Sequence, residues 1–317
     1  MVRVPPTRAL LSPMEPFGWG CRMEPELDCR PEPAHFLHSG HSQHMQDLML
    51  YRRIFCDKCN KVPRTYVELG ALNGKTYSNT LLLESVFGWG GLLIEGQPTN
   101  AEQLNRTRGQ SGRNFIMPEA VCKEPGLVKF LGHAGAGTAG VADYMSDLYK
   151  KQWHSRLTMT TMVPCRPIGH MLKLAGVREV DLFSLDVEGG ELDVLHTMDW
   201  DVRVKLWMIE APTFQPGELD KPREIRRLLA RKGYVEVTSA LRAGPRQRLG
   251  EYNWSAPDML FVHQDLHPTF PERMERCLNM QPCSLADYAQ KLARAAPLFR
   301  DATTSDKTTK PVEGDQT

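Results

Sequence analysis

The chain has 317 residues, of which 41% are hydrophobic and 24% are charged, and its formal net charge is +1. A chain of this length can bury a large core without disulfide or metal staples. The balanced charge gives no electrostatic reason to expect nucleic acid as a partner, and no stretch reaches the ~18 apolar residues of a membrane span.

The chain divides into four predicted segments. Residues 1–40 are rich in proline, and residues 41–264 carry the alternating pattern of a folded domain. Residues 265–300 are predicted to form a helical C-terminal appendage, with a helix over 283–300, and the polar residues 301–317 a disordered tail. Because the proline-interrupted N-terminus does not resemble a signal peptide, we expect a cytoplasmic location by default.

Short apolar runs alternate with helical patterns between residues 41 and 264, which is typical of a parallel sheet covered by helices. The runs are rich in Val, Ile, Leu and Phe, as in strands buried on both faces. Strands are predicted at 65–70, 91–95, 114–117, 180–186, 205–210, 234–238 and 258–263, and helices near 79–87, 99–108, 167–175, 189–198 and 221–232. The predicted fold is a doubly wound α/β domain with a mostly parallel seven-stranded sheet, whose final strand is antiparallel.

The eight cysteines are irregularly spaced, unlike a disulfide framework. Cys56 and Cys59 form the single CxxC pair, and a structural zinc site would need a second pair at suitable spacing. We therefore expect reduced thiols and no zinc.

A glycine-containing turn follows the first predicted strand, in Glu68-Leu-Gly70-Ala71-Leu-Asn73-Gly74. Glycine permits a tight turn and a close backbone approach to a ligand, at the strand end where open α/β sheets bind ligands. The spacing lacks the G-x-G-x-x-G of a dinucleotide site, which argues against a nicotinamide-dependent oxidoreductase. Taken alone, the two glycines could simply end the strand.

An acidic residue, Glu95, ends the second predicted strand. A carboxylate at this place can accept hydrogen bonds from ribose hydroxyls, whereas a solvated strand-end acid is the plain alternative. The order of glycine turn, helix and acid favours a nucleoside ligand. The intervening helix opens at Ser78-Asn79-Thr80, where exposed amides could hold the carboxylate of an amino-acid ligand.

Three further acids lie at later strand ends: Asp186, Glu188 and Glu210. They could complement a helix dipole, share a proton, or act as a base on a hydroxyl substrate. Asp186 and Glu210 together could also bind a divalent cation, although we predict no metal here.

The residues quoted above belong to a larger set of motifs that resembles the FkbM-type methyltransferase family. The set comprises SQ at 42–43, QD at 46–47, YVELGALNG at 66–74, SNT at 78–80, GWGGLLIE at 88–95 and SLDVEG at 184–189. The resemblance implies a class I methyltransferase fold, S-adenosylmethionine as cofactor, and methyl transfer to oxygen, often on a sugar or another small molecule.

Residue by residue, the resemblance assigns most of the cofactor site. The methionine half is expected on Glu68, Gly70, Ala71 and Gly74, with Asn73 and Asn79 nearby; the ribose is expected on Glu95, the adenine on Glu119 and Ala120, and the transferring methyl beside Asp186. Asn73 departs from the family, which usually carries an acid there, and GQPT at 96–99 replaces the usual PNP.

The predicted function is therefore S-adenosylmethionine-dependent O-methylation of a small-molecule or glycan hydroxyl, with Asp186 or Glu188 as the base. The alternative is a methyltransferase-like domain that binds or traffics a partner without catalysis. Segments 133–166 and 211–222 fall where covers over such a sheet form, or are plain surface loops.

Overall fold

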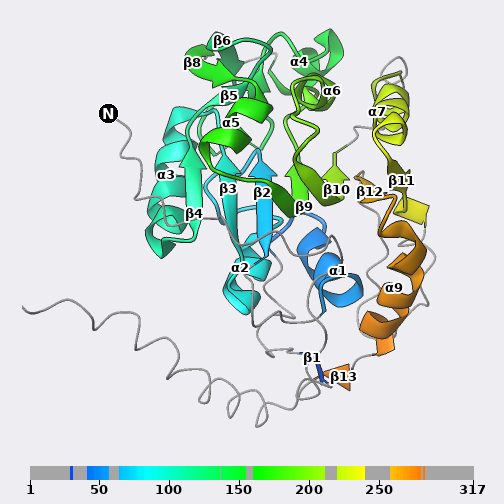
Figure 1. Ribbon diagram of the computed structural model, residues 1–317. Coiled ribbons are helices and arrows are strands. Elements are labelled where there is room, and N and C mark those ends of the chain that lie inside the picture. The colour runs from blue at the N-terminus through cyan, green and yellow to red at the C-terminus, as the bar shows by residue number, and fades with distance from the viewer. Residues whose placement is uncertain are drawn as a thin grey trace, which may run out of the picture.

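The computed structural model describes residues 29–30, 41–56, 64–135, 137–154, 160–210, 220–239, 258–279 and 281–282. Its centre is a seven-stranded sheet in the order β11-β12-β10-β9-β2-β3-β4 (Figure 1). The strands are β2 (Thr65–Leu69), β3 (Gly90–Ile94), β4 (Asn114–Met117), β9 (Glu179–Leu185), β10 (Arg203–Ile209), β11 (Tyr234–Glu236) and β12 (Met259–His263). All seven coincide with predicted strands, so the α/β class is confirmed.

The sheet is mixed rather than purely parallel. Strands β4, β3, β2, β9 and β10 pair in parallel, whereas β12 runs antiparallel to both β10 and β11. Strands β3 and β4 continue the sheet on one side of β2, and β10, β12 and β11 continue it on the far side of β9. The crevice beyond the carboxyl ends of these two neighbours is therefore the topological switch point, where open α/β sheets bind their ligands.

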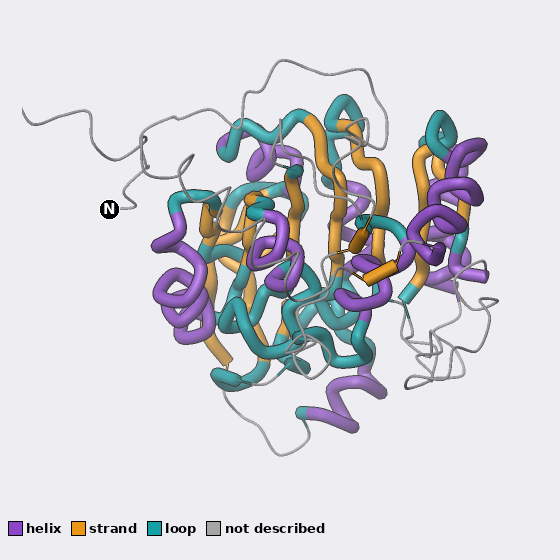
Figure 2. The backbone as a smooth tube through the Cα atoms, turned by 90° about the horizontal axis from the view of Figure 1, so that it is seen from below, coloured by secondary structure: helices purple, strands orange, loops and turns teal. Residues whose placement is uncertain are grey.

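Helices cover both faces of this sheet (Figure 2). One face packs against α5 (Ile168–Leu174), α6 (Glu191–His196) and α7 (Asp220–Arg231), and the other against α1 (Gln46–Arg53), α2 (Leu81–Phe87), α3 (Pro98–Arg108) and α9 (Phe270–Asn279). Successive strand residues alternate between the two cores: Val67 and Leu69 join the first and Tyr66 the second. Helix α1 was not predicted. Helix α9 falls within the segment 265–300 that was predicted as a helical appendage, and the helix predicted over 283–300 lies outside the described residues.

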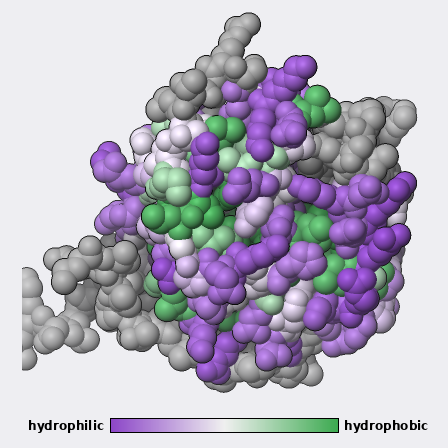
Figure 3. All heavy atoms as spheres, turned by 90° about the horizontal axis from the view of Figure 1, so that it is seen from above, coloured by the Kyte–Doolittle hydropathy of each residue, from purple (hydrophilic) through white to green (hydrophobic). Residues whose placement is uncertain are grey.

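A second, four-stranded sheet stands above the carboxyl ends of the first. It comprises β5 (Ala120–Val121), β6 (Gly126–Leu131), β7 (Gly140–Val141) and β8 (Thr160–Arg166), in the order β5-β8-β6-β7. Helix α4 (Asp147–Trp153) lies between β7 and β8 in the chain. The segment 133–166 thus contains regular structure rather than a plain loop. Seen from above, this end of the molecule exposes hydrophobic side chains among hydrophilic ones (Figure 3).

The expectation of reduced cysteines is wrong for four of the eight. Cys56 is bonded to Cys277, and Cys122 to Cys165, across 221 and 43 residues of sequence respectively. The first bond joins the end of α1 to α9, and the second joins β5 to β8. Cys56 is therefore not a zinc ligand. Cys59, the other cysteine of the CxxC pair, lies outside the described residues.

Short elements complete the described chain. Strands β1 (Cys29–Arg30) and β13 (Gln281–Pro282) pair in parallel, and two 3₁₀ turns span Gly109–Ser111 and His267–Thr269. Among the described helices, none has the length and apolar character needed to cross a membrane.

Candidate functional site

The glycine turn after β2 and the acid after β3 meet at one place. Gly70 has a φ of +88°, and a Cβ there would lie 1.9 Å from the carbonyl oxygen of Asp186, so only glycine fits. The amides of Gly70 and Ala71 both donate to the Ile94 carbonyl oxygen at 3.1 Å. The amide of Leu72 donates to Glu95 Oε2 at 2.9 Å. The carboxylate of Glu95 therefore holds the turn directly, and the predicted convergence is present.

A cavity of about 430 Å³, counting the space open to solvent, lies over this junction. Five of the predicted cofactor residues line it, namely Gly70, Glu95, Glu119, Ala120 and Asp186. The second sheet supplies the opposite wall through Phe130, Val141 and other residues of β5, β6 and β7. The switch-point crevice is thus closed from above into a pocket.

Glu95 is a buried carboxylate that can accept further hydrogen bonds. Burial raises its pKa to about 7, against the lowering effect of the Gln97 and Leu72 amides, and nearby Asp186 adds to the rise. The Gln97 amide donates to Oε1 at 2.7 Å. Each carboxylate oxygen accepts one backbone hydrogen bond and keeps a further lone pair for a ligand.

Glu68 is not among the residues that line the cavity. Its carboxylate accepts hydrogen bonds from Ser78 Oγ at 3.0 Å, the Asn79 amide at 2.6 Å and Thr80 Oγ1 at 2.6 Å. These bonds fasten the segment before α2 to the end of β2. Glu68 therefore shapes the loop that follows the glycine turn, and direct contact with a cofactor stays a prediction.

Arg108, at the end of α3, is a central site residue that sequence reasoning missed. Its side chain is 2% exposed and ion-paired with Glu84. It donates to the Gly74 carbonyl oxygen at 3.0 Å, Ser78 Oγ at 3.1 Å and the Tyr66 hydroxyl at 2.7 Å. The only sequence signal was its place on the inner face of α3, four residues after the apolar Leu104.

Gly74 leaves room for the side chain of Arg108. Its φ is +78°, and a Cβ there would lie 2.6 Å from Arg108 Cγ and from a methyl carbon of Leu104. The second glycine of the turn is therefore required by the close passage of α3. It does not line the cavity.

The two asparagines of the predicted site have local partners. Asn73 Oδ1 accepts hydrogen bonds from the Lys75 and Thr76 amides at 3.0 and 2.8 Å. Aspartate carries an equivalent oxygen, so either residue can accept these two amide hydrogen bonds. Asn79 Nδ2 donates to Ser184 Oγ at 3.0 Å, and Asn79 Oδ1 is buried with no hydrogen-bond partner in the described part of the chain.

The acids after β9 and β10 form one cluster. Carboxylate oxygens of Asp186, Glu188 and Glu210 all lie within 4.8 Å of one another. Asp186 and Glu210 are hydrogen-bonded, which requires a shared proton, and the Tyr149 hydroxyl donates to Glu188. Glu188 has a φ of 59°, a left-handed conformation that is uncommon for this residue type and frequent at functional sites.

Burial dominates the electrostatics of this cluster. It raises the pKa of Asp186 to about 7 and that of Glu188 to about 9, with Asp186 adding to the second shift. Burial also raises the pKa of Glu210 well above its usual value, again reinforced by Asp186. Near neutral pH the cluster therefore holds protons, and Asp186 is the member that gains or loses one most readily.

This chemistry allows two uses. Carboxylates that share protons near neutral pH can accept a proton from a substrate hydroxyl. Three oxygens at this spacing could also ligate a divalent cation, as foreseen for Asp186 and Glu210. Asp186 connects the cluster to the cavity, because it alone of the three lines it.

A family profile described as the methyltransferase FkbM domain matches residues 68–236, more than half of the chain. This chain belongs to the FkbM methyltransferase family. The matched region runs from Glu68 to the end of β11 and includes the glycine turn, Glu95 and the acid cluster. The family is a class I methyltransferase family, which implies use of S-adenosylmethionine.

The solved structures that match parts of this chain include three methyltransferases. The FkbM methyltransferase of Methylobacillus flagellatus is 12% identical with a TM-score of 0.37, and the match covers 63% of this chain and 44% of that one. The mitomycin 7-O-methyltransferase MmcR is 16% identical with a TM-score of 0.29, and the match covers 63% of this chain and 48% of that one. The human methyltransferase 10 domain containing protein is 12% identical with a TM-score of 0.34, and the match covers 73% of this chain and 79% of that one. No curated protein matches the sequence.

Proposed function

We propose that this FkbM-family methyltransferase binds S-adenosylmethionine in the cavity over Gly70 and Glu95 and methylates a hydroxyl oxygen of a small molecule or glycan. The observation that carries the proposal is the position of Asp186. It lines the cavity beside the glycine turn and is also hydrogen-bonded into the acid cluster. One residue thus joins the cavity over the glycine turn to a group of proton acceptors.

The residues present fit the proposed cofactor. Glu95 offers carboxylate lone pairs to the ribose, and Glu119 and Ala120 form the wall expected to face the adenine. Asn79 Oδ1 is buried outside the lining of the cavity and lacks a partner among the described residues, so its contact with the methionine half stays a prediction.

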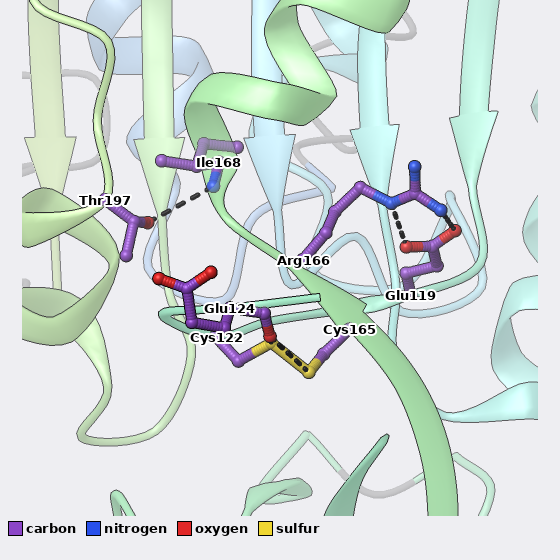
Figure 4. Close-up of a disulfide and its surroundings, with 7 residues drawn as sticks. All are labelled: Glu119, Cys122, Glu124, Cys165, Arg166, Ile168 and Thr197. Carbon is purple, nitrogen blue, oxygen red and sulfur yellow. Dashed lines mark hydrogen bonds and ion pairs between the residues drawn. A yellow bond between two sulfur atoms is a disulfide. The ribbon is translucent and has the colours of Figure 1, made fainter. Parts of the chain in front are cut away.

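Glu119 needs its own support to serve in that wall. Arg166 of β8 pairs with it through two hydrogen bonds, the longer at 2.6 Å. The Cys122–Cys165 disulfide joins the residue that follows β5 to the residue before Arg166 (Figure 4). The wall is thus fixed to β8 by a bidentate ion pair and a covalent bond, which favours a preformed pocket.

S-adenosylmethionine supplies an activated methyl group when bound. The protein positions the acceptor oxygen in line with that methyl and removes the hydroxyl proton. Ionised Asp186 accepts the proton, and Glu210 stabilises the ionised form through the hydrogen bond that joins the two carboxyls. Glu188, fixed by Tyr149, orients the acceptor through its remaining oxygen.

Two aromatic rings of α4 lie next to the acid cluster, because Tyr149 donates to Glu188 and Trp153 lies beside Tyr149. The Tyr149 and Trp153 rings lie 6.5 Å apart between centroids, and the Trp153 side chain is half exposed. A flat apolar surface beside hydrogen-bonding carboxylates suits an acceptor that has both ring faces and hydroxyls. This combination supports a glycan or another polyhydroxylated ring compound.

Radiolabelled methyl transfer to a panel of hydroxylated acceptors tests the proposal. We expect transfer by the wild-type protein and loss of at least 100-fold in the rate with Asp186→Asn, while binding of S-adenosylhomocysteine is reduced far less. The exposed residue Asp147→Asn is the matched control. Undiminished transfer by Asp186→Asn would remove this residue as base. Cofactor binding without transfer to any acceptor would favour the non-catalytic alternative.

A further inference from the structure

Two disulfides join cysteines that are far apart in the sequence. Cys56 and Cys277 are separated by 221 residues, and Cys122 and Cys165 by 43. All four side chains are buried, and none of the cysteines with a described side chain is free. Two independent pairings of this kind are typical of proteins that fold in an oxidising compartment, because cytosolic thiols are kept reduced.

Both disulfides occupy structural positions. The Cys56–Cys277 bond ties α1 to α9 on one face of the main sheet. The Cys122–Cys165 bond joins β5 to β8 beside the ion pair of Glu119 with Arg166, as Figure 4 shows. Burial shields both disulfides from reductants and from disulfide-exchange enzymes, so we interpret them as permanent structural cross-links.

An acceptor sequence for N-linked glycans lies on the outer face of α3, at Asn105-Arg106-Thr107. Asn105 is exposed, and its side-chain amide makes no hydrogen bond to the described residues. It shares this face with exposed Glu102 and Arg106, while Leu104 and Arg108 point inward. A glycan attached here would extend into solvent without displacing the core.

We propose that this chain folds in an oxidising, secretory compartment and carries an N-linked glycan on Asn105. The juxtaposition of two buried disulfides with an exposed acceptor asparagine carries the inference, which is independent of the proposed methyl transfer. It replaces the cytoplasmic location expected from the N-terminal sequence. A second acceptor sequence, Asn253-Trp-Ser, lies outside the described residues.

The chemistry needs two partners of that compartment. Each disulfide forms when two thiols lose two protons and two electrons to a disulfide-bearing oxidoreductase, which is reduced to its dithiol. The amide nitrogen of Asn105 displaces a lipid-linked pyrophosphate from C1 of an oligosaccharide. A nitrogen–carbon bond forms, the carbon–oxygen bond to pyrophosphate breaks, and a base of the transferase takes the amide proton.

Expression of the full chain behind a cleavable secretory leader in eukaryotic cells, and in parallel in a reducing bacterial cytosol, tests the proposal. Peptide mass spectrometry after enzymatic glycan release marks each formerly glycosylated asparagine as aspartate. We expect the mark at Asn105 in the leader-directed protein, its loss in Asn105→Gln, and its retention in Arg106→Lys, which preserves the acceptor sequence.

Thiol labelling and thermal melting provide the second arm. In the leader-directed protein, Cys56, Cys122, Cys165 and Cys277 should resist alkylation until reductant and denaturant are added together. The same chain produced in a reducing bacterial cytosol should label at these cysteines and melt at least 5 °C lower. An unmodified Asn105 in folded, leader-directed protein would overturn the glycan assignment. A fully reduced form of equal melting temperature would overturn the oxidising compartment.

Discussion

The replacement Glu95→Gln should separate the proposed cofactor site from the fold that surrounds it. Glutamine has nearly the same shape, but its amide nitrogen cannot accept hydrogen bonds. In the native protein the two oxygens of Glu95 accept the Leu72 and Gln97 amides at 2.9 and 2.7 Å. One of these buried donors loses its partner in the variant, which costs about 1–3 kcal/mol of folding free energy.

The loss in cofactor binding should be larger than the loss in folding. Each hydrogen bond from a ribose hydroxyl to a carboxylate contributes about 1.5–3 kcal/mol. Removing the charge from a two-bond contact therefore costs about 3 kcal/mol or more. That is a decrease of ~100-fold in affinity, because each 1.4 kcal/mol is a factor of ten.

Calorimetric titration with S-adenosylhomocysteine between pH 5.5 and 8.5 measures both effects. The pKa of Glu95 in the free protein is raised to about 7, so the carboxyl is largely protonated below that pH and must lose its proton to accept both hydroxyls. Binding by the wild type should therefore weaken as the pH falls below about 7, by up to tenfold per pH unit.

The exposed helical acid Glu102→Gln is the matched control, and it should bind as the wild type does. Glu95→Gln should lose the pH dependence together with the affinity. Equal dissociation constants for Glu95→Gln and the wild type, with the same pH dependence, would refute the assignment of Glu95 to the ribose.

Three further predictions concern stability and turnover. Arg108→Met should lower the free energy of unfolding in urea by about 3–5 kcal/mol, because it leaves the buried carboxylate of Glu84 unpaired; an unchanged midpoint would contradict this. Cys56→Ser should cost ~2–5 kcal/mol, since its bond to Cys277 closes a loop of 221 residues, and the effect should vanish when both proteins are compared under reducing conditions. Methyl transfer should rise as the pH increases through about 7, because the raised pKa of Asp186 keeps the base protonated below that value; a flat profile from pH 5.5 to 8.5 would exclude it.

The main sheet could be predicted because its strands are buried on both faces. Runs such as VDLFSLD and KLWMIE are almost continuously apolar, a pattern that few other elements share. The second sheet escaped prediction for the opposite reason. Strands β5 and β7 have two residues each, and β6 is mostly exposed, so neither length nor periodicity marks them.

The strand-end acids were predictable for a topological reason. Parallel strands bring their carboxyl ends to one edge, so Glu95, Asp186 and Glu210 had to lie near one another. Contacts that depend on packing between distant elements were not predictable. Arg108 reaches the 74–80 segment only because α3 passes over Gly74, and Cys56 meets Cys277 only because α9 folds back onto α1.

The most direct test of a cofactor pocket over the glycine turn is to fill it. Ala139 lines the cavity, is partly exposed and lies at the edge of the second sheet's small core, so Ala139→Phe would place a ring in the proposed cofactor space and leave the two cores of the main sheet unchanged. Calorimetric titration with S-adenosylhomocysteine should show saturable one-to-one binding by the wild type. It should show none by the variant, with melting temperatures within about 3 °C of each other. Equal binding by both proteins would contradict this location, and no binding by either would contradict cofactor use by this chain.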